Sequence, residues 1–240
     1  MDRRRPLSQL SLAPLGEIAS RELLGELLGA DPSLGDLPDR IYERTGGNPF
    51  FIEEIVRVLA GQASLEGTRG GYRLAAPNAT LALPMTVQSL LASRVDRLGE
   101  RAKHALQAAA VIGKIFDEPL VEAVTGLGDR DLAAALAALQ DAELIHLVTP
   151  YPQPQYAFKH PLTLEVAYQS QLGERRARMH ASVAEALEKL RADRLGEYAS
   201  LIAHHWEASG MRFEAARWKH RAALKVSNIK LKVRRPTRLS

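Results

Sequence analysis

Apolar residues recur at helical spacing along most of this chain, in short segments that Gly, Pro or polar turns separate. Leu23, Leu24, Leu27 and Leu28 share one helix face, and their segment stops at Gly29, a residue type that commonly ends helices. Such a stripe must be buried against another element, so the periodicity predicts a mainly α fold of packed helices. Helices are predicted over 17–28, 36–44, 49–60, 86–97, 100–112, 118–125, 129–142, 174–191, 197–208 and 212–225.

Strand patterns are few and short. Leu7–Leu15 alternates apolar and polar residues and predicts one orphan strand, without a neighbouring partner. The pieces ELIHLV and QYAFKH, joined by the turn-rich TPYPQP, predict a β-hairpin. The segment VIGKIF is interpreted as a helix end. Residues 61–84 are rich in Gly, Ala, Ser and Pro and are interpreted as a linker, with a short hairpin around Tyr72–Leu74.

The order of these elements predicts separate domains. Helices closed by a β-hairpin over 85–172 are typical of a winged-helix domain. The amphipathic helices over 173–225, broken at Gly210, are typical of a tetratricopeptide-like helical hairpin. Residues 226–240, which begin where the helical pattern breaks, are predicted to be a basic, disordered tail.

Composition restricts the compartment and the chemistry. The chain has no cysteine, so it can form neither a disulfide framework nor a thiolate metal site. No run of about 18 apolar residues is present, which predicts no membrane span. The N-terminal MDRRRPLSQLSLAPL has too short an apolar stretch for a signal peptide. Cytoplasmic localisation is therefore expected.

The net charge of +4 comes from the C-terminal end. The last sixteen residues hold six bases and no acid, and without them 26 basic residues stand against 28 acidic ones. A basic tail can bind nucleic acid or anionic lipid without specificity, so the charge does not by itself indicate a nucleic-acid-binding fold.

Sequence signatures of catalysis are missing. No G-x-x-x-x-G-K-[ST] loop occurs; Gly113–Lys114 is followed by Ile115 where a hydroxyl would hold Mg²⁺. No Ser–His–Asp signature and no H-E-x-x-H occurs either. His204 and His205 are adjacent on a predicted helix and point about 100° apart, so a shared metal is not expected. The sequence predicts no catalytic residue and no metal site.

The candidate recognition helix of the winged-helix region is acidic. Asp129, Asp131, Asp141 and Glu143 stand against the single base Arg130. A helix that enters a DNA groove needs donors and positive charge to meet phosphates and base edges. An interaction or scaffold role is expected, without specific nucleic-acid binding.

Two motifs together carry a family resemblance. RTGGNPFFIEEI and YAFKHPLTLEVAY are similar to paired signatures of the signal-transduction ATPases with numerous domains, the STAND class (AAA-type, P-loop). The likeness extends over residues 7–225. It is strongest to ATPase modules fused to class III adenylate or guanylate cyclases or to LuxR-type regulators. It implies that residues 1–60 are the C-terminal remnant of a nucleotide-binding domain, comprising its last strand and a helical lid.

The resemblance also implies site residues. Gly47, Asn48 and Pro49 resemble the motif beside the adenine, and His160 resembles a phosphate-sensing histidine. A proline at a helix start offers a flat apolar face, and a histidine at a helix N-terminus lies where anions bind. Without the resemblance, Gly47, Asn48 and Pro49 are as consistent with an ordinary capped helix after a Gly turn as with an adenine site. His160 is also consistent with a capping or partly buried core histidine. In the intact parent ADP or ATP would bind there, and this fragment is expected to retain none.

The resulting expectation is a nucleotide-sensing regulatory fragment of an ATP-binding signalling protein, lacking Walker A and B motifs and not itself an enzyme. Its partners would be the missing upstream ATPase core, the downstream repeats, and proteins bound through the helical repeats, with possible self-association. Two alternatives remain open. One is a free-standing winged-helix and helical-repeat interaction module without a nucleotide role; the other is a DNA-binding transcriptional regulator.

Overall fold

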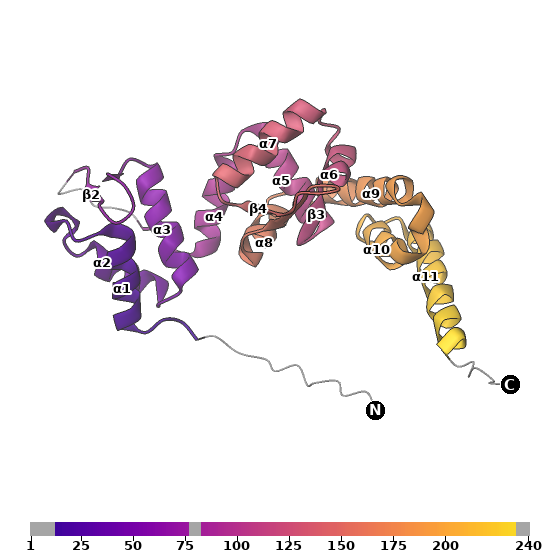
Figure 1. Ribbon diagram of the computed structural model, residues 1–240, viewed down its shortest axis with the longest axis horizontal. Coiled ribbons are helices and arrows are strands. Elements are labelled where there is room, and N and C mark those ends of the chain that lie inside the picture. The colour runs from indigo at the N-terminus through magenta and orange to yellow at the C-terminus, as the bar shows by residue number, and fades with distance from the viewer. Residues whose placement is uncertain (1–12, 77–82, 234–240) are drawn as a thin grey trace. The chain divides into compact units, whose positions relative to one another are not determined.

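The computed structural model describes residues 13–76 and 83–233 and is mainly helical (Figure 1). Eleven α-helices lie in these ranges, with two small antiparallel sheets. The chain divides into two compact units, Met1–Leu91 and Ala92–Ser240, with the division inside α4 (Val87–Asp96). None of the helices in the described ranges is long and apolar enough to cross a membrane.

The first unit is a small helical cluster. It contains α1 (Glu17–Leu28), the 3₁₀ turn η1 (Pro32–Leu34), α2 (Leu37–Thr45) and α3 (Pro49–Gly61), and the three α-helices pack on one another. The predicted helices 17–28, 36–44 and 49–60 are confirmed to within a residue. Their apolar stripes meet in the core, where Leu28, Ile41 and Ile55 are fully buried. Each such side chain contributes about 1.5–3 kcal/mol.

A two-stranded hairpin covers the end of α1. Strands β1 (Leu65–Glu66) and β2 (Arg73–Leu74) pair antiparallel, inside the segment interpreted as a linker. The Gly70 and Tyr72 amides donate to the Leu27 and Leu28 carbonyls, at 2.9 and 2.8 Å. The last carbonyls of a helix need outside donors, so the hairpin serves as the C-terminal cap of α1.

The second unit begins with helices around a three-stranded sheet. It contains α5 (Glu100–Ile112), β3 (Ile115–Asp117), α6 (Glu118–Thr125), α7 (Asp129–Asp141), β4 (Ile145–Thr149), β5 (Gln155–Phe158) and α8 (Pro161–Gln169). The strand order is β3-β5-β4, all antiparallel. The predicted hairpin is confirmed.

Strand β3 corrects one interpretation, because VIGKIF is only in part a helix end. Helix α5 stops at Ile112, and the chain returns as β3 to pair with β5, with Phe116 opposite Tyr156. Phe116 stacks on Tyr156 and meets Phe158 edge-on, at centroid distances of 5.9 and 5.7 Å. A three-residue strand has too short a pattern to be recognised from periodicity, so pairing with β5 decides its conformation.

The C-terminal part of this unit is formed by α9 (Gly173–Leu190), the 3₁₀ turn η2 (Ala192–Arg194), α10 (Leu195–Ala208) and α11 (Arg212–Val233). Each α-helix packs on the next (Figure 1). Leu190 of α9 and Leu201 of α10 are 39% and 38% exposed. The small residues Ala199 and Ala203 are buried instead, because they allow close approach of neighbouring helices.

Two predictions concern the chain ends. Residues 7–12 of the predicted strand lie outside the described residues, and Ala13–Gly16 form no strand. Helix α11 continues to Val233, beyond the boundary predicted for the tail at 226, and residues 234–240 lie outside the described ranges. No Gly or Pro interrupts 212–233, so nothing in the backbone chemistry stops the helix earlier.

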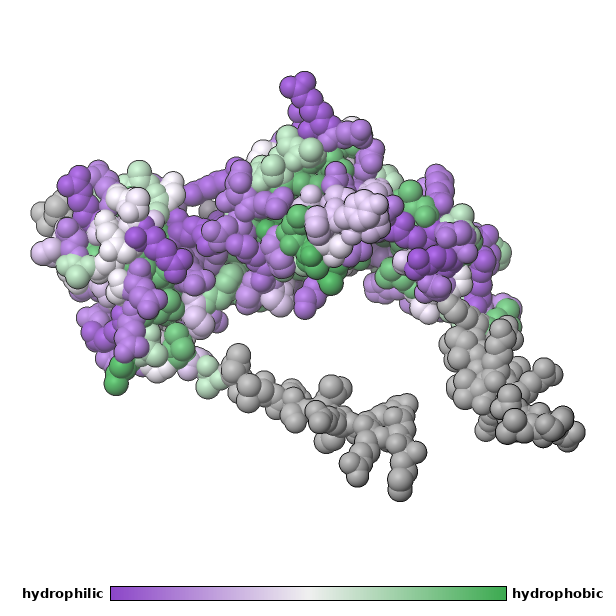
Figure 2. Space-filling view, in the orientation of Figure 1, coloured by the Kyte–Doolittle hydropathy of each residue, from purple (hydrophilic) through white to green (hydrophobic). Residues whose placement is uncertain are grey.

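On the face shown in Figure 2 hydrophilic residues predominate, with apolar residues over the region of β3 and β4. Ile115 of β3 is 54% exposed, and Leu147 and Val148 of β4 are 42% and 46% exposed. The two strands lie at opposite edges of their sheet, where a strand has one neighbour rather than two.

Candidate functional site

The start of α3 has the geometry that the sequence predicts. Asn48 is the N-cap, and its side chain accepts a hydrogen bond from the Phe51 amide at 3.1 Å. Pro49 occupies the first helical position, where a missing N–H costs nothing. Asn48 and Pro49 are both exposed, so they can be reached from solvent.

Gly47 is held against the segment that precedes α1. Its carbonyl accepts from the Leu15 amide at 2.8 Å, and its φ of 77° lies in the left-handed region. A Cβ at this position would lie 2.0 Å from the Leu15 carbonyl oxygen. Gly47 is therefore required for two reasons, its backbone angle and its close approach to Leu15.

His160 caps α8. The ring Nδ1 accepts a hydrogen bond from the Leu162 amide at 3.2 Å, and the backbone of His160 is extended. Pro161 follows at the first helical position, as Pro49 does in α3. Both predicted sites thus share one local design, a side-chain N-cap followed by proline.

The cap determines the protonation of His160. An Nδ1 atom that accepts a hydrogen bond carries no proton, so the imidazole is neutral with its proton on Nε2. Partial burial lowers the pKa of His160 below its usual value, which also favours the neutral ring. In acid, protonation of Nδ1 would remove the cap.

The predicted site residues belong to two different units. Gly47, Asn48 and Pro49 lie in the first unit and His160 in the second. Each group is organised within its own unit, as described above. That one nucleotide contacts both remains a prediction.

A buried histidine pair joins α9 to α10. The Nδ1 atoms of His180 and His205 lie 2.8 Å apart, and the Tyr168 hydroxyl lies 3.0 Å from His180 Nε2. The two histidines are only 2% and 1% exposed. Sequence reasoning treated His204 and His205 as structural but did not find His180 as the partner, because the pairing spans 25 residues and two helices.

The environment of this pair keeps both rings neutral. Burial, together with the neighbouring His204, lowers the pKa of His180 to about 4 and that of His205 to about 3. Whichever Nδ1 carries the shared proton, Nε2 of His205 is buried and makes no hydrogen bond within the described part of the chain. The contact between the two rings stabilises the packing of α9 on α10, and it requires both rings to be neutral.

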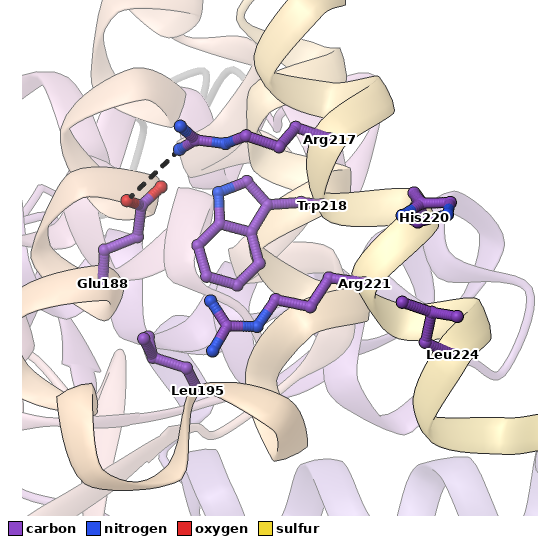
Figure 3. Close-up of a pocket in the computed structure, with 7 residues that line it drawn as sticks. All are labelled: Glu188, Leu195, Arg217, Trp218, His220, Arg221 and Leu224. Carbon is purple, nitrogen blue, oxygen red and sulfur yellow. Dashed lines mark ion pairs between the residues drawn. The ribbon is translucent and has the colours of Figure 1, made fainter. Parts of the chain in front are cut away.

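A pocket between α9, α10 and α11 was also missed. Trp218 lines a cavity with Arg217 and Arg221 from the same helix (Figure 3). The available signal was the spacing of Arg221, three residues after the tryptophan, which places both side chains on one face of the helix. We call this cavity the Trp218 pocket.

No catalytic residue and no metal site was predicted. Among the residues that the structure describes, no group of three or more His, Asp or Glu side chains is arranged to hold a metal ion.

Comparisons with known proteins give two similarities. Residues 16–66 match the model of a domain of unknown function, DUF8739. The chain is also 28% identical, over 185 residues, to a protein of Rhizobium meliloti (strain 1021) that is described as uncharacterized. That match covers 77% of this chain but 17% of the relative, so the chain spans about a sixth of the relative's length.

The DUF8739 match covers the helices of the first unit. The matched residues 16–66 comprise α1, η1, α2, α3 and β1, and so include Gly47, Asn48 and Pro49. His160 lies outside that match.

Proposed function

We propose that this chain is the nucleotide-sensing, regulatory part of a longer STAND-class signalling ATPase. In this proposal Gly47, Asn48 and Pro49 lie beside the adenine of ADP or ATP, and His160 senses the phosphates. The observation that carries the proposal is the state of His160, a neutral ring at a helix start whose Nε2 holds the proton. A donor at a helix N-terminus suits a phosphate oxygen.

The residues at the start of α3 fit a purine. Pro49 is exposed and rigid, and an exposed apolar ring can lie against the flat face of a base. The turn at Gly46 and Gly47, both at positive φ, allows the backbone of this segment to pass close to neighbouring groups. These features support adenine contact at this helix start.

The arrangement of the second unit supports the domain assignments within this proposal. We assign α5, α6, α7 and the β3-β5-β4 sheet to a winged-helix domain that extends over 85–172 and ends with α8. We assign α9, α10 and α11 to tetratricopeptide-like helices, since consecutive helices pack on one another and are joined by short turns at η2 and Gly210. A match to one sixth of a much longer relative is compatible with a regulatory segment within a larger protein.

The interaction-module alternative also has a specific observation in its favour, the Trp218 pocket in the helical segment. The DNA-binding alternative has less support. Asp131 at the start of α7 pairs with Arg101 at 2.9 Å, and the exposed residues of α7 include four alanines, Asp129 and Asp141. Among the exposed residues of α7, Arg130 and Gln140 alone offer side-chain donors to phosphates or base edges.

The first test is the coding sequence on both sides of this chain. We expect a phosphate-binding loop of the G-x-x-x-x-G-K-[ST] type to be encoded upstream, because residues 1–240 contain none. If no such loop is encoded in the neighbourhood, the proposal is overturned.

The second test uses the longer protein that carries both the ATPase core and the residues of this chain. His160→Asn keeps a side-chain N-cap for α8 but removes the imidazole, whereas His160→Ala removes both. If His160 senses phosphate, both variants should release bound ADP at least about tenfold faster than wild type, as for a lost charge-assisted hydrogen bond. If His160 is only a cap, His160→Asn should retain ADP like wild type.

A third test concerns catalysis. The purified 240-residue chain should release no phosphate from Mg·ATP above a buffer blank. Magnesium-dependent release that a single substitution in this chain abolishes would contradict the regulatory assignment.

A further inference from the structure

The Trp218 pocket has the size and lining of a binding site. Its volume is about 510 Å³, within the usual range of about 300–1,000 Å³ for ligand pockets. Glu188 comes from α9, Leu195 from α10, and Arg217, Trp218, Arg221 and Leu224 come from α11 (Figure 3). Three successive helices therefore build it within one unit.

The pocket has an apolar interior. Trp218 is 3% exposed and forms part of the wall, with Leu195 half-buried beside it. Leu224 is 53% exposed at the pocket, so much of its apolar surface contacts water. A large apolar side chain seated between Leu195 and Leu224 would remove this surface from water.

The two arginines at the pocket differ in their partners among the described residues. Arg217 is paired with Glu214 at 2.7 Å and more loosely with Glu188 at 3.8 Å. The Arg221 guanidinium instead lies 4.9 Å from the Trp218 ring centroid, and no ion pair to it is found within the described part of the chain. An incoming carboxylate can therefore pair with Arg221 without displacing an existing partner.

The indole of Trp218 adds a buried donor. Its Nε1 is buried and makes no hydrogen bond within the described residues, and in Figure 3 the nitrogen lies on the side of Glu188 and Arg217. A buried N–H without an acceptor is unfavourable, so an oxygen that entered between Glu188 and Arg217 would be stabilised there.

The charge of α11 defines the partner further. Its sequence holds seven basic residues and one acidic residue, and residues 1–211 hold 22 bases against 27 acids. This excess of basic residues in the sequence of α11 favours an acidic partner. Because Arg221 already covers one face of the indole, stacking of a nucleic-acid base on that face is not available.

We propose that the Trp218 pocket binds an acidic peptide segment of a partner protein. A large apolar side chain of the peptide lies between Leu195 and Leu224, and a neighbouring carboxylate pairs with Arg221. This site is separate from the start of α3 and from His160, and its function does not depend on a nucleotide.

The test measures binding of a short fluorescein-labelled peptide, with one phenylalanine between glutamates, to the full 240-residue chain by fluorescence anisotropy. Arg221→Gln and Leu224→Ser change exposed side chains, so both variants should fold, which circular dichroism verifies. The matched control is Arg212→Gln, which removes the same charge from an exposed position of α11 outside the pocket lining.

We expect each pocket variant to raise the Kd by about tenfold or more and Arg212→Gln to raise it by less than about twofold. The peptide with alanine for phenylalanine should bind Leu224→Ser as weakly as it binds wild type, and the peptide with glutamine for glutamate should bind Arg221→Gln as weakly as it binds wild type. Equal losses for Arg221→Gln and Arg212→Gln would show unspecific attraction to a polycation and overturn the proposal. An oligonucleotide whose binding depends on Leu224 as the peptide's does would also overturn it.

Discussion

Asp117 and Arg191 form an ion pair between the N-cap of α6 and the end of α9, with side chains only 13% and 17% exposed. Asp117 uses its other carboxylate oxygen to accept from the Leu120 amide at 3.0 Å. Arg191 also lies over the Tyr198 ring, 5.7 Å from its centroid. One aspartate thus caps a helix and fastens the C-terminal helices to the sheet-containing part of the second unit.

Breaking this pair should destabilise the second unit. Asp117→Asn retains a good N-cap but leaves the Arg191 charge partly buried without its partner, so we expect a loss of about 2–4 kcal/mol. Asp117→Ala should lose about 1 kcal/mol more, because the cap is removed as well. Urea unfolding monitored by circular dichroism measures both.

The control for this experiment is Glu174→Gln. Glu174 and Arg178 form an exposed pair at 3.9 Å, for which a change below about 0.5 kcal/mol is expected. A stability of Asp117→Asn equal to that of Glu174→Gln would show that the buried pair contributes nothing.

Gly47 and Gly46 offer a matched comparison in the first unit. Both have positive φ, 77° and 56°, but only Gly47 has a neighbour that a Cβ would strike. Gly46→Ala should cost about 1 kcal/mol, from backbone strain alone. Gly47→Ala should cost about 3 kcal/mol or more, since the contact with Leu15 must also open. Equal thermal shifts for the two variants would contradict the close approach.

The stability of the second unit should fall in acid because of His180 and His205. Both have a lowered pKa in the folded state, about 4 and about 3, against about 6.5 when unfolded, so the unfolded chain binds protons first. Their contribution is fully present above about pH 6.5 and is lost as the pH falls towards 4 and then 3. Between pH 7.5 and 5 the loss should be of the order of 2 kcal/mol per histidine.

Urea unfolding at a series of pH values measures this loss. In His180→Gln/His205→Gln the pH dependence over this range should be reduced, whereas His220→Gln, at an exposed position, should leave it as in wild type. Ring NMR signals of wild type give a second readout. Titration of both rings near pH 6.5 would be inconsistent with a buried neutral pair.

His160 should contribute to stability through its cap. His160→Ala should lower the free energy of unfolding by about 1 kcal/mol at pH 7.5, and His160→Asn should be close to wild type. Because the pKa of His160 is lowered in the folded state, wild type should become less stable than His160→Asn as the pH falls below about 6.5. Guanidinium unfolding at two pH values tests this, and a His160→Ala variant as stable as wild type would refute the cap.

Some features of the candidate site are set by neighbouring residues in the sequence, and others are set by contacts between residues far apart in the sequence. The caps at Asn48 and His160 were predicted because an N-cap and a following proline act within one helical turn. The contact of Gly47 with Leu15 was not, because it joins residues 32 positions apart through backbone atoms that leave no side-chain pattern. The same holds for the Trp218 pocket, whose lining comes from three helices.

The sequence by itself determined where the helices lie, because the apolar period, the caps and the Gly and Pro breaks are properties of neighbouring residues. Only the tertiary structure decided that Ile115–Asp117 is a strand, that a hairpin caps α1, and that His180 meets His205. Each of these depends on groups distant in sequence whose hydrogen-bonding needs are met only after the helices have packed.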